Sequence, residues 1–352
     1  MKITQLSIKG YEKVYHAIDE KTGLNSYVAI HDTTLGPALG GCRYYHYVNE
    51  EAQLTDTLRL AKGMTYKSSL AGLNLGGGKA TINSSVDNFH CRHKTTELWK
   101  SFAELLNHIN GDYITASDMG TTIDDLKEIS KYSNFVQGQN SENDSGIATA
   151  YGVYQSIKAV TKFLYGSDSL KSKTIAVQGL GKVGKRLIKF CTEEGAKIVA
   201  TDTDTKRFTE VSIEYPYSQI SFVQPDEIYE IECDVFSPCA IGGILNSDTI
   251  SKLKCSGIAG GANNQLEREE HIKELGGRNI YYVPDYLANS GGVIVIAKDR
   301  NEILVDLNYD DPMVKNKLDA IYDITYEVLT ESINSKQTTI EICDGLAEKR
   351  IS

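Results

Sequence analysis

The sequence lacks long apolar runs, cysteine pairs and a secretory leader. No apolar run approaches the roughly 20 residues that a membrane-spanning helix needs. Residues 1–10 lack the apolar core and cleavage site of a signal peptide. The 7 cysteines are an odd number, are widely scattered and include no CxxC pair, so they indicate no disulfide framework. We therefore expect a cytoplasmic protein without membrane segments.

Clustered positive charge and metal-ligand spacings are also missing. The net charge of -10 at pH 7 disfavours a nucleic acid partner, because binding a polyanion relies on clustered Lys and Arg. The nearest approach to a metal site, His90 and His93, is interpreted as a solvated turn or helix face, so no metal is predicted. With 352 residues, 41% of them hydrophobic, the chain can form two domains with separate cores. These observations favour an enzyme that acts on a small molecule.

The first part of the chain mixes strands and helices. We predict a strand at 27–31, a loop at 36–41, an amphipathic helix from about 50 to 64 and a strand at 80–83. A second helix is expected at 97–109, ended by Asn110 and Gly111. A polar stretch at 138–148 is the best linker candidate. Residues 1–140 are therefore assigned to a first, mixed α/β domain.

Beyond the linker, apolar strands alternate with helical segments. A helix at 152–164 precedes strands at 174–178, 197–201, 233–237, 257–259 and 280–283. Near-continuous apolar strands separated by helices are typical of a parallel sheet covered on both faces. We assign residues 141–327 to a doubly wound dinucleotide-binding domain of Rossmann type. The chain is helical again from about 311, and its last helix, about 328–352, is expected to pack back on the first domain.

A glycine signature directly follows the strand that ends at residue 178. It consists of Gly179, Leu180, Gly181, Lys182, Val183 and Gly184. A lone GxGxxG is common in loops, but this one also opens a helical pattern, which is the context that a dinucleotide site requires. Gly179 permits a tight turn, Gly181 lets the backbone approach a pyrophosphate, and Gly184 allows close packing of the helix on the sheet. The N-terminus of that helix would stabilise the negative charge.

Asp202 ends the next strand, about 20 residues further on, as the dinucleotide motif requires. A carboxylate at this place accepts hydrogen bonds from a ribose diol and repels a 2′-phosphate, which favours NAD over NADP. Lys206 and Arg207 are close enough to leave NADP open. The alternative interpretation of Asp202 is an ordinary N-cap or turn residue.

Two lysines, Lys67 and Lys79, bracket a second glycine-rich stretch. A phosphate loop would need glycine six positions before the second lysine and Ser or Thr after it, but Leu73 and Ala80 hold those places. Most lysines are solvated surface charges. A lysine desolvated beside another cation instead has its neutral form favoured and can act as a base. Asp118 is the candidate proton-transfer partner, although alone it would be interpreted as a helix cap.

Several separated segments together carry a family resemblance. They are Gly36–Arg43, Lys62–Lys67, Gly76–Lys79, Tyr113–Asp118, Thr149–Val153, Val177–Gly181, Pro238–Gly243, Gly261–Asn264, Pro284–Asn289 and Gly345–Ile351. In these segments the chain resembles the glutamate/leucine/phenylalanine/valine dehydrogenases, and most of all the leucine-specific members. The resemblance implies reversible NAD-dependent oxidative deamination of L-leucine and other branched-chain amino acids, which yields 2-keto acids and ammonia. It also implies that the domain of residues 1–140 binds substrate and carries the catalytic residues, and that the protein is a homo-oligomer.

The resemblance implies roles for residues at matching positions. Lys67 would bind the substrate carboxylate, Lys79 would be the general base for the water that attacks the imine, and Asp118 would exchange protons with the amino group. The remaining substrate contacts would be Gly40, Gly41, Leu39, Ala116, Val293, Ile296 and, on the carboxylate from the cofactor side, Asn289. Thr149 and Asn264 would hold the nicotinamide carboxamide, and Asn263 the ribose. Further cofactor contacts would fall on Cys239, Ala240 and Ala262.

The resemblance also bears on specificity. Glutamate-specific relatives carry a lysine at the position of Leu39, and an apolar residue there leaves a distal carboxylate buried without a partner. Aliphatic residues at the other pocket positions favour a branched-chain substrate, although plain core packing is the alternative for all of them. A phenylalanine, tryptophan or valine dehydrogenase of the same mechanism stays open. A nucleotide-binding regulatory protein with a decayed site is disfavoured because Lys67, Lys79 and Asp118 are intact.

Three segments depart from the family's usual pattern. Ser290 and Val295 replace an alanine and an asparagine in the segment that begins at Asn289, and Gly146–Thr149 replaces a Ser-Pro-Val-Thr sequence. Tyr44–His46 replaces a more usual aromatic pattern. All three segments fall near the expected pocket or hinge. We expect such changes to alter substrate choice or to lower activity.

Overall fold

The computed structural model describes residues 1–84, 94–139, 145–216, 219–298 and 311–352. Two compact units form: unit 1 contains Met1–Asn143, Ile296–Asp306 and Ala347–Ser352, and unit 2 contains Asp144–Val295 and Leu307–Leu346. His90, His93 and the middle of the expected linker, 140–144, lie outside the described residues. No helix among the described residues is long and apolar enough to cross a membrane.

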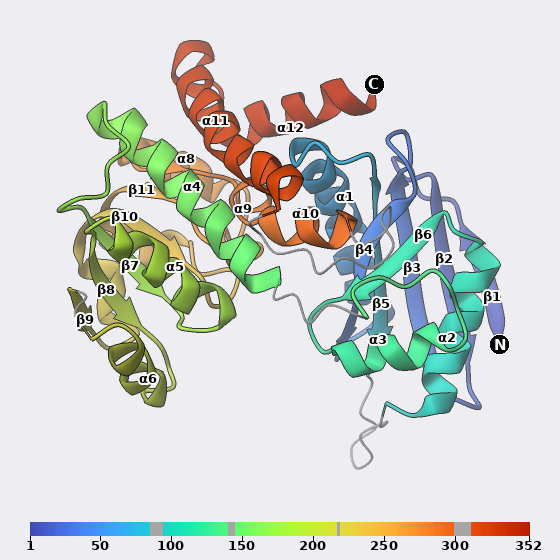
Figure 1. Ribbon diagram of the computed structural model, residues 1–352. Helices are drawn as coiled ribbons and strands as arrows, with labels where there is room; N and C mark the ends of the chain where they lie inside the picture. The colour runs from blue at the N-terminus through green and yellow to red at the C-terminus, as the bar shows by residue number, and fades with distance from the viewer. Residues whose placement is uncertain (85–93, 140–144, 217–218, 299–310) are drawn as a thin grey trace. The chain divides into compact units, whose positions relative to one another are not determined.

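Unit 1 is built on a six-stranded mixed sheet with the order β1-β2-β3-β5-β4-β6 (Figure 1). The strands are β1 (Lys2–Leu6), β2 (Lys13–Asp19), β3 (Leu24–Asp32), β4 (Ala38–Tyr45), β5 (Gly76–Asn83) and β6 (Tyr113–Ser117). β1 pairs with β2, β2 with β3, and β3 with β5, and each of these pairs is antiparallel. β4 lies between β5 and β6 and is parallel to both. The strands predicted at 27–31 and 80–83 are confirmed as parts of longer ones.

The loop predicted at 36–41 is wrong from residue 38 onward, where β4 begins. Its glycines serve a close contact between strands. A Cβ atom on Gly40 would lie 1.8 Å from the carbonyl oxygen of Gly78 on β5. Glycine inside a strand commonly marks such an approach of two backbones. The glycines at 40–41 and before Lys79 therefore belong to two paired, buried strands.

Three helices cover the two faces of this sheet: α1 (Glu50–Leu70), α2 (Thr96–Ile109) and α3 (Ile123–Ser130). α1 starts at Asn49, whose side chain accepts a hydrogen bond from the Ala52 amide, and it runs past the predicted end at 64 to include Lys67. The helix predicted at 97–109 is confirmed as α2, which ends at Asn110 in the left-handed conformation.

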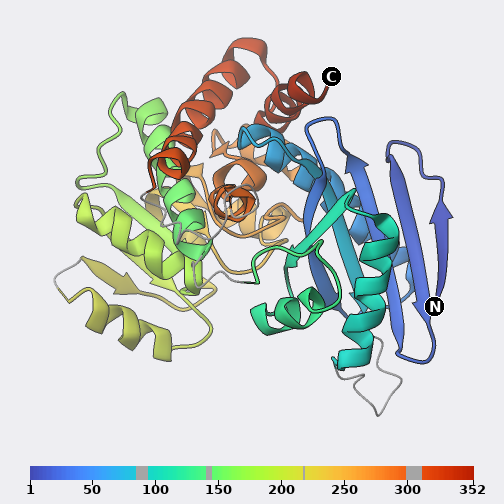
Figure 2. The ribbon, with the colours of Figure 1, turned by 45° about the vertical axis from the view of Figure 1, so that its right-hand side comes forward.

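α1 packs on one face of the sheet, and α2 and α3 pack on the other, as Figure 2 shows for α2. Because side chains alternate along a strand, the core under α2 and α3 takes every second residue of β4 and β5. These core residues are Ala38, Cys42, Ala80 and Ile82. Leu39, Arg43 and Lys79 therefore project from the opposite face, the one that α1 covers.

Unit 2 contains a six-stranded sheet with the order β12-β11-β10-β7-β8-β9, and all of its pairs are parallel. The strands are β7 (Thr174–Gln178), β8 (Lys197–Thr201), β9 (Ile220–Phe222), β10 (Glu232–Pro238), β11 (Lys254–Ile258) and β12 (Tyr281–Tyr282). The order reverses between β7 and β10, which is the doubly wound topology expected of a Rossmann domain. The predicted α/β class and five of these strands are confirmed, and only the short β9 was not foreseen.

Helices cover both faces of the second sheet (Figure 1). The helical elements are α4 (Ser145–Tyr165), α5 (Lys182–Glu193), α6 (Lys206–Glu214), η1 (Glu227–Glu230), α7 (Ser247–Lys252), α8 (His271–Gly277), α9 (Asp285–Ala288), α10 (Gly291–Lys298), α11 (Pro312–Ser335) and α12 (Thr339–Ile351). Phe236 and Ile258 pack with α7 and α8, while Gly257 faces Val160 of α4. The expected linker is shorter than predicted, because α4 begins at Ser145 rather than near Gly152 and buries Ala148.

Residues 347–352, at the end of α12, belong to unit 1 and bind the C-terminal part of α1. The Arg350 guanidinium donates to the carbonyl oxygen of Ser69 at 2.6 Å. The Ser69 hydroxyl in turn donates to the carbonyl oxygen of Ala347 at 2.9 Å, and the Tyr66 hydroxyl donates to Glu348 at 2.8 Å. The Ser69 carbonyl also accepts from the Gly72 amide at 3.0 Å, so Arg350 adds a charged donor to a carbonyl group at the end of α1.

We expect Phe102→Ala to lower the free energy of unfolding of unit 1 by about 3–5 kcal/mol, because Phe102 is fully buried between α2 and the sheet. Trp99, the single tryptophan, is buried on the same helix, so its fluorescence during urea unfolding reports on this unit. Val48→Ala is the control, since Val48 is 83% exposed and its loss should change stability by less than about 0.5 kcal/mol. Equal effects of the two substitutions would contradict this assignment of the core.

Candidate active site

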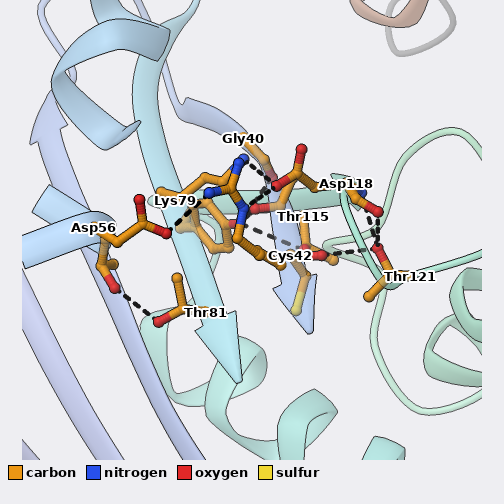
Figure 3. Close-up of polar contacts among 12 residues, drawn as sticks. Gly40, Cys42, Asp56, Lys79, Thr81, Thr115, Asp118 and Thr121 are labelled. Atoms are coloured by element: carbon orange, nitrogen blue, oxygen red, sulfur yellow. Dashed lines mark hydrogen bonds and ion pairs between the residues drawn. The ribbon is translucent and has the colours of Figure 1, made fainter. Parts of the chain in front are cut away.

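Lys79 and Asp118 form a largely buried ion pair in unit 1 (Figure 3). Lys79 lies on β5, and Asp118 follows directly after β6. The lysine Nζ lies 2.9 Å from Oδ2 of Asp118, and their side chains are 5% and 18% exposed. The prediction placed a second cation beside Lys79; the ion-pair partner of Lys79 is this carboxylate, and the cation Arg43 contacts the same oxygen. The two residues that the sequence proposed as proton-transfer partners are thus in direct contact.

Arg43, at the end of β4, contacts the same carboxylate oxygen. Its Nε donates to Oδ2 of Asp118 at 3.0 Å, and its Nη1 donates to Oδ2 of Asp56 on α1 at 2.9 Å. The Tyr47 hydroxyl also donates to that oxygen of Asp56, at 2.7 Å. One guanidinium therefore joins a carboxylate on α1 to the carboxylate that follows β6.

The charges around Asp118 set its protonation state. Burial alone raises the pKa of this carboxyl, but the positive charges of Lys79 and Arg43 and their hydrogen bonds outweigh burial and hold the pKa well below its usual range. Behind it, burial raises the pKa of the Cys42 thiol beyond any physiological pH. Asp118 is therefore ionised at neutral pH, and the buried thiol beside it stays neutral.

The backbone around Asp118 is fixed by its neighbours. The Asp118 amide donates to the Thr121 hydroxyl at 2.8 Å, and this hydroxyl donates to the carbonyl oxygen of Cys42 at 2.7 Å. A Cβ on Gly41 would lie 2.7 Å from Cβ of Asp118, so only glycine leaves room for the carboxylate there. The cap of α3 is Thr122 rather than Asp118, and the helix-cap interpretation of Asp118 is therefore wrong.

The other expected substrate residues of unit 1 lie on β4, β6 and α1. Leu39 and Ala116 are buried, and Gly41 pairs with Ala116 across β4 and β6. Leu39 is on the same face of the sheet as Lys79. Lys67 is half-buried on α1, two residues after Thr65, whose backbone nitrogen approaches Gly77 of β5 closely.

The glycine signature of unit 2 forms a backbone cradle at the start of α5. Gly179 adopts a φ of 97°, and a Cβ on Gly184 would lie 1.9 Å from the carbonyl oxygen of Gly179. The helix starts after Gly181, without a side-chain cap, so the N–H groups of Lys182 and Val183 have no capping side chain. Such a helix N-terminus suits a pyrophosphate.

Asp202, at the end of β8, lies beside this cradle. Its Oδ2 accepts from the Leu180 amide at 2.7 Å and from the Arg207 guanidinium at 3.1 Å, and its Oδ1 accepts from the Asp204 amide at 2.9 Å. Burial alone raises the pKa of the Asp202 carboxyl, but these hydrogen bonds and the charge of Arg207 lower it. The carboxylate is therefore ionised, and the Leu180 amide of the cradle orients it. Its contact with the Asp204 amide also stabilises the turn that follows β8.

The remaining expected cofactor residues surround the ends of β10 and β11. Ala240 approaches Gly179, and Cys239 and Ala262 hydrogen bond through their amides to Gln178 and Pro238. Asn264 has a left-handed φ of 52°, and its amide donates to Asp285 at 3.0 Å. The side-chain nitrogen of Asn289 donates to Oδ1 of Asn263 at 2.9 Å. The buried Oδ1 of Asn289 accepts no hydrogen bond within the described residues, so this atom can accept one from a ligand.

Other expected residues lie on helices. Thr149 is half-buried on α4, its hydroxyl donates to the carbonyl oxygen of Ser145 at 2.8 Å, and a Cβ on Gly292 would approach that hydroxyl. On α10, Val293 is buried in unit 2 and Ile296 is half-buried in unit 1. In the described part of the chain, no three His, Cys, Asp or Glu side chains gather as a metal site.

Two charged residues of these sites had no role assigned from the sequence. Arg43 lies inside a segment that carries the family resemblance, but its partner Asp118 is 75 positions away. Asp56 lies on a helix whose periodicity marks only its apolar face. A sequence signal existed only for Arg43, as a charged residue within a strand-forming, glycine-rich segment.

Comparison with known proteins agrees with this geometry. Residues 11–134 match the family described as Glu/Leu/Phe/Val dehydrogenase, dimerisation domain, and residues 141–207 and 203–348 match Glutamate/Leucine/Phenylalanine/Valine dehydrogenase. The chain is 40% identical over 356 residues to a phenylalanine dehydrogenase of Caldalkalibacillus thermarum, covering 99% of this chain and 93% of the relative. It is 42% identical over 345 residues to a leucine dehydrogenase of Bacillus subtilis, covering 97% and 91%.

A solved structure is similar over the whole chain. The crystal structure of L-tryptophan dehydrogenase from Nostoc punctiforme superposes with a TM-score of 0.82 and 38% sequence identity, over 97% of this chain and 96% of that one. The resemblance noted in the sequence is confirmed. The chain belongs to the glutamate/leucine/phenylalanine/valine dehydrogenase family, and it is an amino acid dehydrogenase of this NAD(P)-dependent class of oxidoreductases.

Proposed function

We propose that the protein catalyses the NAD-dependent oxidative deamination of L-leucine and other branched-chain L-amino acids to 2-keto acids and ammonia, and the reverse reductive amination. The observation that carries the proposal is the buried Lys79–Asp118 pair beside apolar Leu39. Lys79 and Asp118 can transfer protons, and apolar Leu39 offers no partner to a charged substrate side chain. Phenylalanine or tryptophan oxidation by the same mechanism is the second candidate, because relatives with those names match nearly the whole chain.

The proposed proton transfers use three residues of unit 1. Lys67 binds the substrate α-carboxylate, which holds the amino group near Asp118. NAD, which the Gly179–Gly184 segment and Asp202 would hold, would supply the acceptor for the hydride from the substrate Cα. Lys79, when neutral, then takes a proton from the water that attacks the imine carbon, and the carboxylate of Asp118 exchanges a proton with the nitrogen that leaves as ammonia. Aliphatic Leu39 and Ala116 contact the substrate side chain.

The cofactor preference rests on Asp202. Its ionised carboxylate lies beside the cradle that would hold the pyrophosphate, where it would accept hydrogen bonds from the ribose diol and repel a 2′-phosphate. Asn289 offers a buried acceptor, which suits a donor such as the nicotinamide carboxamide better than the substrate carboxylate. We further propose a cytoplasmic homo-oligomer, which the match of residues 11–134 to a dimerisation domain supports.

The deciding experiment measures NADH formation with L-leucine, L-isoleucine, L-valine, L-phenylalanine, L-tryptophan and L-glutamate. We expect the highest kcat/KM for the branched-chain substrates and the lowest for glutamate, whose distal carboxylate would be buried without a partner. A preference for phenylalanine or tryptophan would establish the second candidate. Absence of turnover with all six, in a protein that binds NADH, would favour a regulatory role instead.

We expect Lys79→Ala to lower kcat by about 10²–10⁴-fold, since it removes the proposed general base. Binding of NADH, followed by its fluorescence, should be unchanged because the cradle lies in unit 2. Lys127→Ala is the matched control, as the Lys127 side chain is 58% exposed on α3, and this variant should retain full turnover. Near-normal turnover of Lys79→Ala would remove this lysine from the mechanism.

Asp202→Ser should shift the cofactor preference toward NADPH. The substitution removes the carboxylate that would repel a 2′-phosphate. It also releases Arg207, which in the wild type pairs with Asp202 at 3.1 Å. Because like charges in contact cost several kcal/mol, the ratio of the Kd values for NADPH and NADH should fall by about tenfold or more. Titration calorimetry measures both constants. Adding Arg207→Ala should reverse the gain, and an unchanged ratio in Asp202→Ser would rule out this role.

A further inference from the structure

We propose that Arg43, anchored by Asp56, is a positioning residue for the reaction: it fixes one carboxylate oxygen of Asp118 and thereby presents the other oxygen to the substrate amino group. The inference rests on the proposed function of Asp118 and deepens it. It adds a second charged pair behind the proton-transfer residues, and it gives a role to two side chains that the sequence left unassigned.

The geometry separates the two oxygens of Asp118. Oδ2 receives both cations, Lys79 Nζ at 2.9 Å and Arg43 Nε at 3.0 Å. Within the part of the chain that the structure describes, no hydrogen bond reaches Oδ1. The carboxylate is held from one side by two charge-assisted contacts, which are the strong kind, so its rotation is restricted and Oδ1 is the oxygen left for a ligand.

The guanidinium is itself held from behind. Asp56 accepts from its Nη1 at 2.9 Å and from the Tyr47 hydroxyl at 2.7 Å. Arg43 is only 11% exposed and Asp56 21% exposed, so solvent competes weakly with these contacts. Burial alone raises the pKa of the Tyr47 hydroxyl, and the contact with Asp56 raises it further, which keeps this hydroxyl a neutral donor. The planar fork of Arg43 can bridge the two carboxylates, which a lysine ammonium does less well.

The chain of charges Asp56–Arg43–Asp118–Lys79 alternates in sign and sums to zero. During the proposed reaction Lys79 changes between charged and neutral, whereas an arginine side chain stays protonated. Arg43 is therefore the cation that remains beside Asp118 when Lys79 has lost its proton. The groups that face Asp118 from the packed elements are Lys79 on β5, Arg43 and the neutral Cys42 thiol on β4, Tyr113 on β6 and the Thr121 hydroxyl.

The pH dependence follows from the sign of this effect. A cation favours the ionised carboxylate, so removing Arg43 raises the pKa of Asp118 in the folded protein. Activity that needs ionised Asp118 is then lost at a higher pH than in the wild type as the pH falls. One adjacent arginine lowers the pKa of an aspartate by about 1–3 units. The acidic limb of kcat/KM should therefore move upward, and the size of the pKa shift is measured on the Asp118 carboxyl itself.

The test uses four variants of the full chain. Arg43→Met removes the charge, Arg43→Lys retains it with a poorer fork, and Asp56→Asn weakens the anchor. Arg59→Met is the matched control, because Arg59 is exposed on the same helix as Asp56. For Arg43→Met we expect a loss in kcat of roughly 10²-fold through misplacement of Asp118, with the shifted acidic limb. Arg43→Lys should restore the limb with kcat only partly recovered, Asp56→Asn should lower kcat less than Arg43→Met, and Arg59→Met should match the wild type.

A purely structural role would give a different result. In that case Arg43→Met and Arg43→Lys would both lower the Tm and kcat, and the acidic limb would stay in place; this outcome overturns the proposal. NADH binding serves as the check that unit 2 is intact in every variant.

A second readout does not depend on turnover. Infrared spectra of each protein, minus those of the same protein with Asp118→Asn, isolate the carboxyl band of Asp118 as the pH is lowered from 8 to about 2. With Arg43 present this carboxyl should remain ionised to a lower pH than in Arg43→Met, where the protonated band should appear about 1–3 pH units higher. If no amino acid is oxidised by the wild type, the proposed function fails while this titration still decides the role of Arg43. An unchanged titration in Arg43→Met overturns that role.

Discussion

The carboxylate of Asp118 between two cations is the interaction on which the site of unit 1 depends. A buried carboxylate without partners would be neutral, and a buried lysine without an anion would be destabilising. Held together, Lys79 and Asp118 make each other's burial tolerable. The contact in turn requires a glycine at 41, where any Cβ would collide with Asp118, and the close pairing of β4 with β5.

The two units offer different kinds of groups to negatively charged parts of a ligand. Unit 2 offers backbone: a turn with positive φ at Gly179 and an uncapped helix start at Gly181, which suit a diffuse pyrophosphate charge. Unit 1 offers side chains, whose ammonium and carboxylate groups can also gain and lose protons. A backbone amide cannot do this. The division matches the chemistry, because the dinucleotide needs only to be held, whereas the amino acid must exchange protons.

The sequence predicted unit 2 far better than unit 1. In unit 2 each motif is local, since a strand, a glycine turn and a helix follow one another within one segment. In unit 1 the glycines near 40 were interpreted as a loop, because one sequence does not show that Gly40 lies against Gly78 on another strand. The role of Arg43 was not predicted for the same reason, because it depends on contacts with Asp56 and Asp118 that form only in the folded chain. Long-range pairing, rather than composition, was the missing information.

The contacts of residues 347–352 with α1 have a consequence for synthesis on the ribosome. The β-sheet of unit 1 and its helices α1 to α3 are encoded in the first 143 residues, yet the end of α1 receives a charged donor from Arg350. The nascent N-terminal part therefore emerges without this contact, and it gains the contact only after unit 2 has left the exit tunnel. Unit 1 is the first to emerge and the last to be complete.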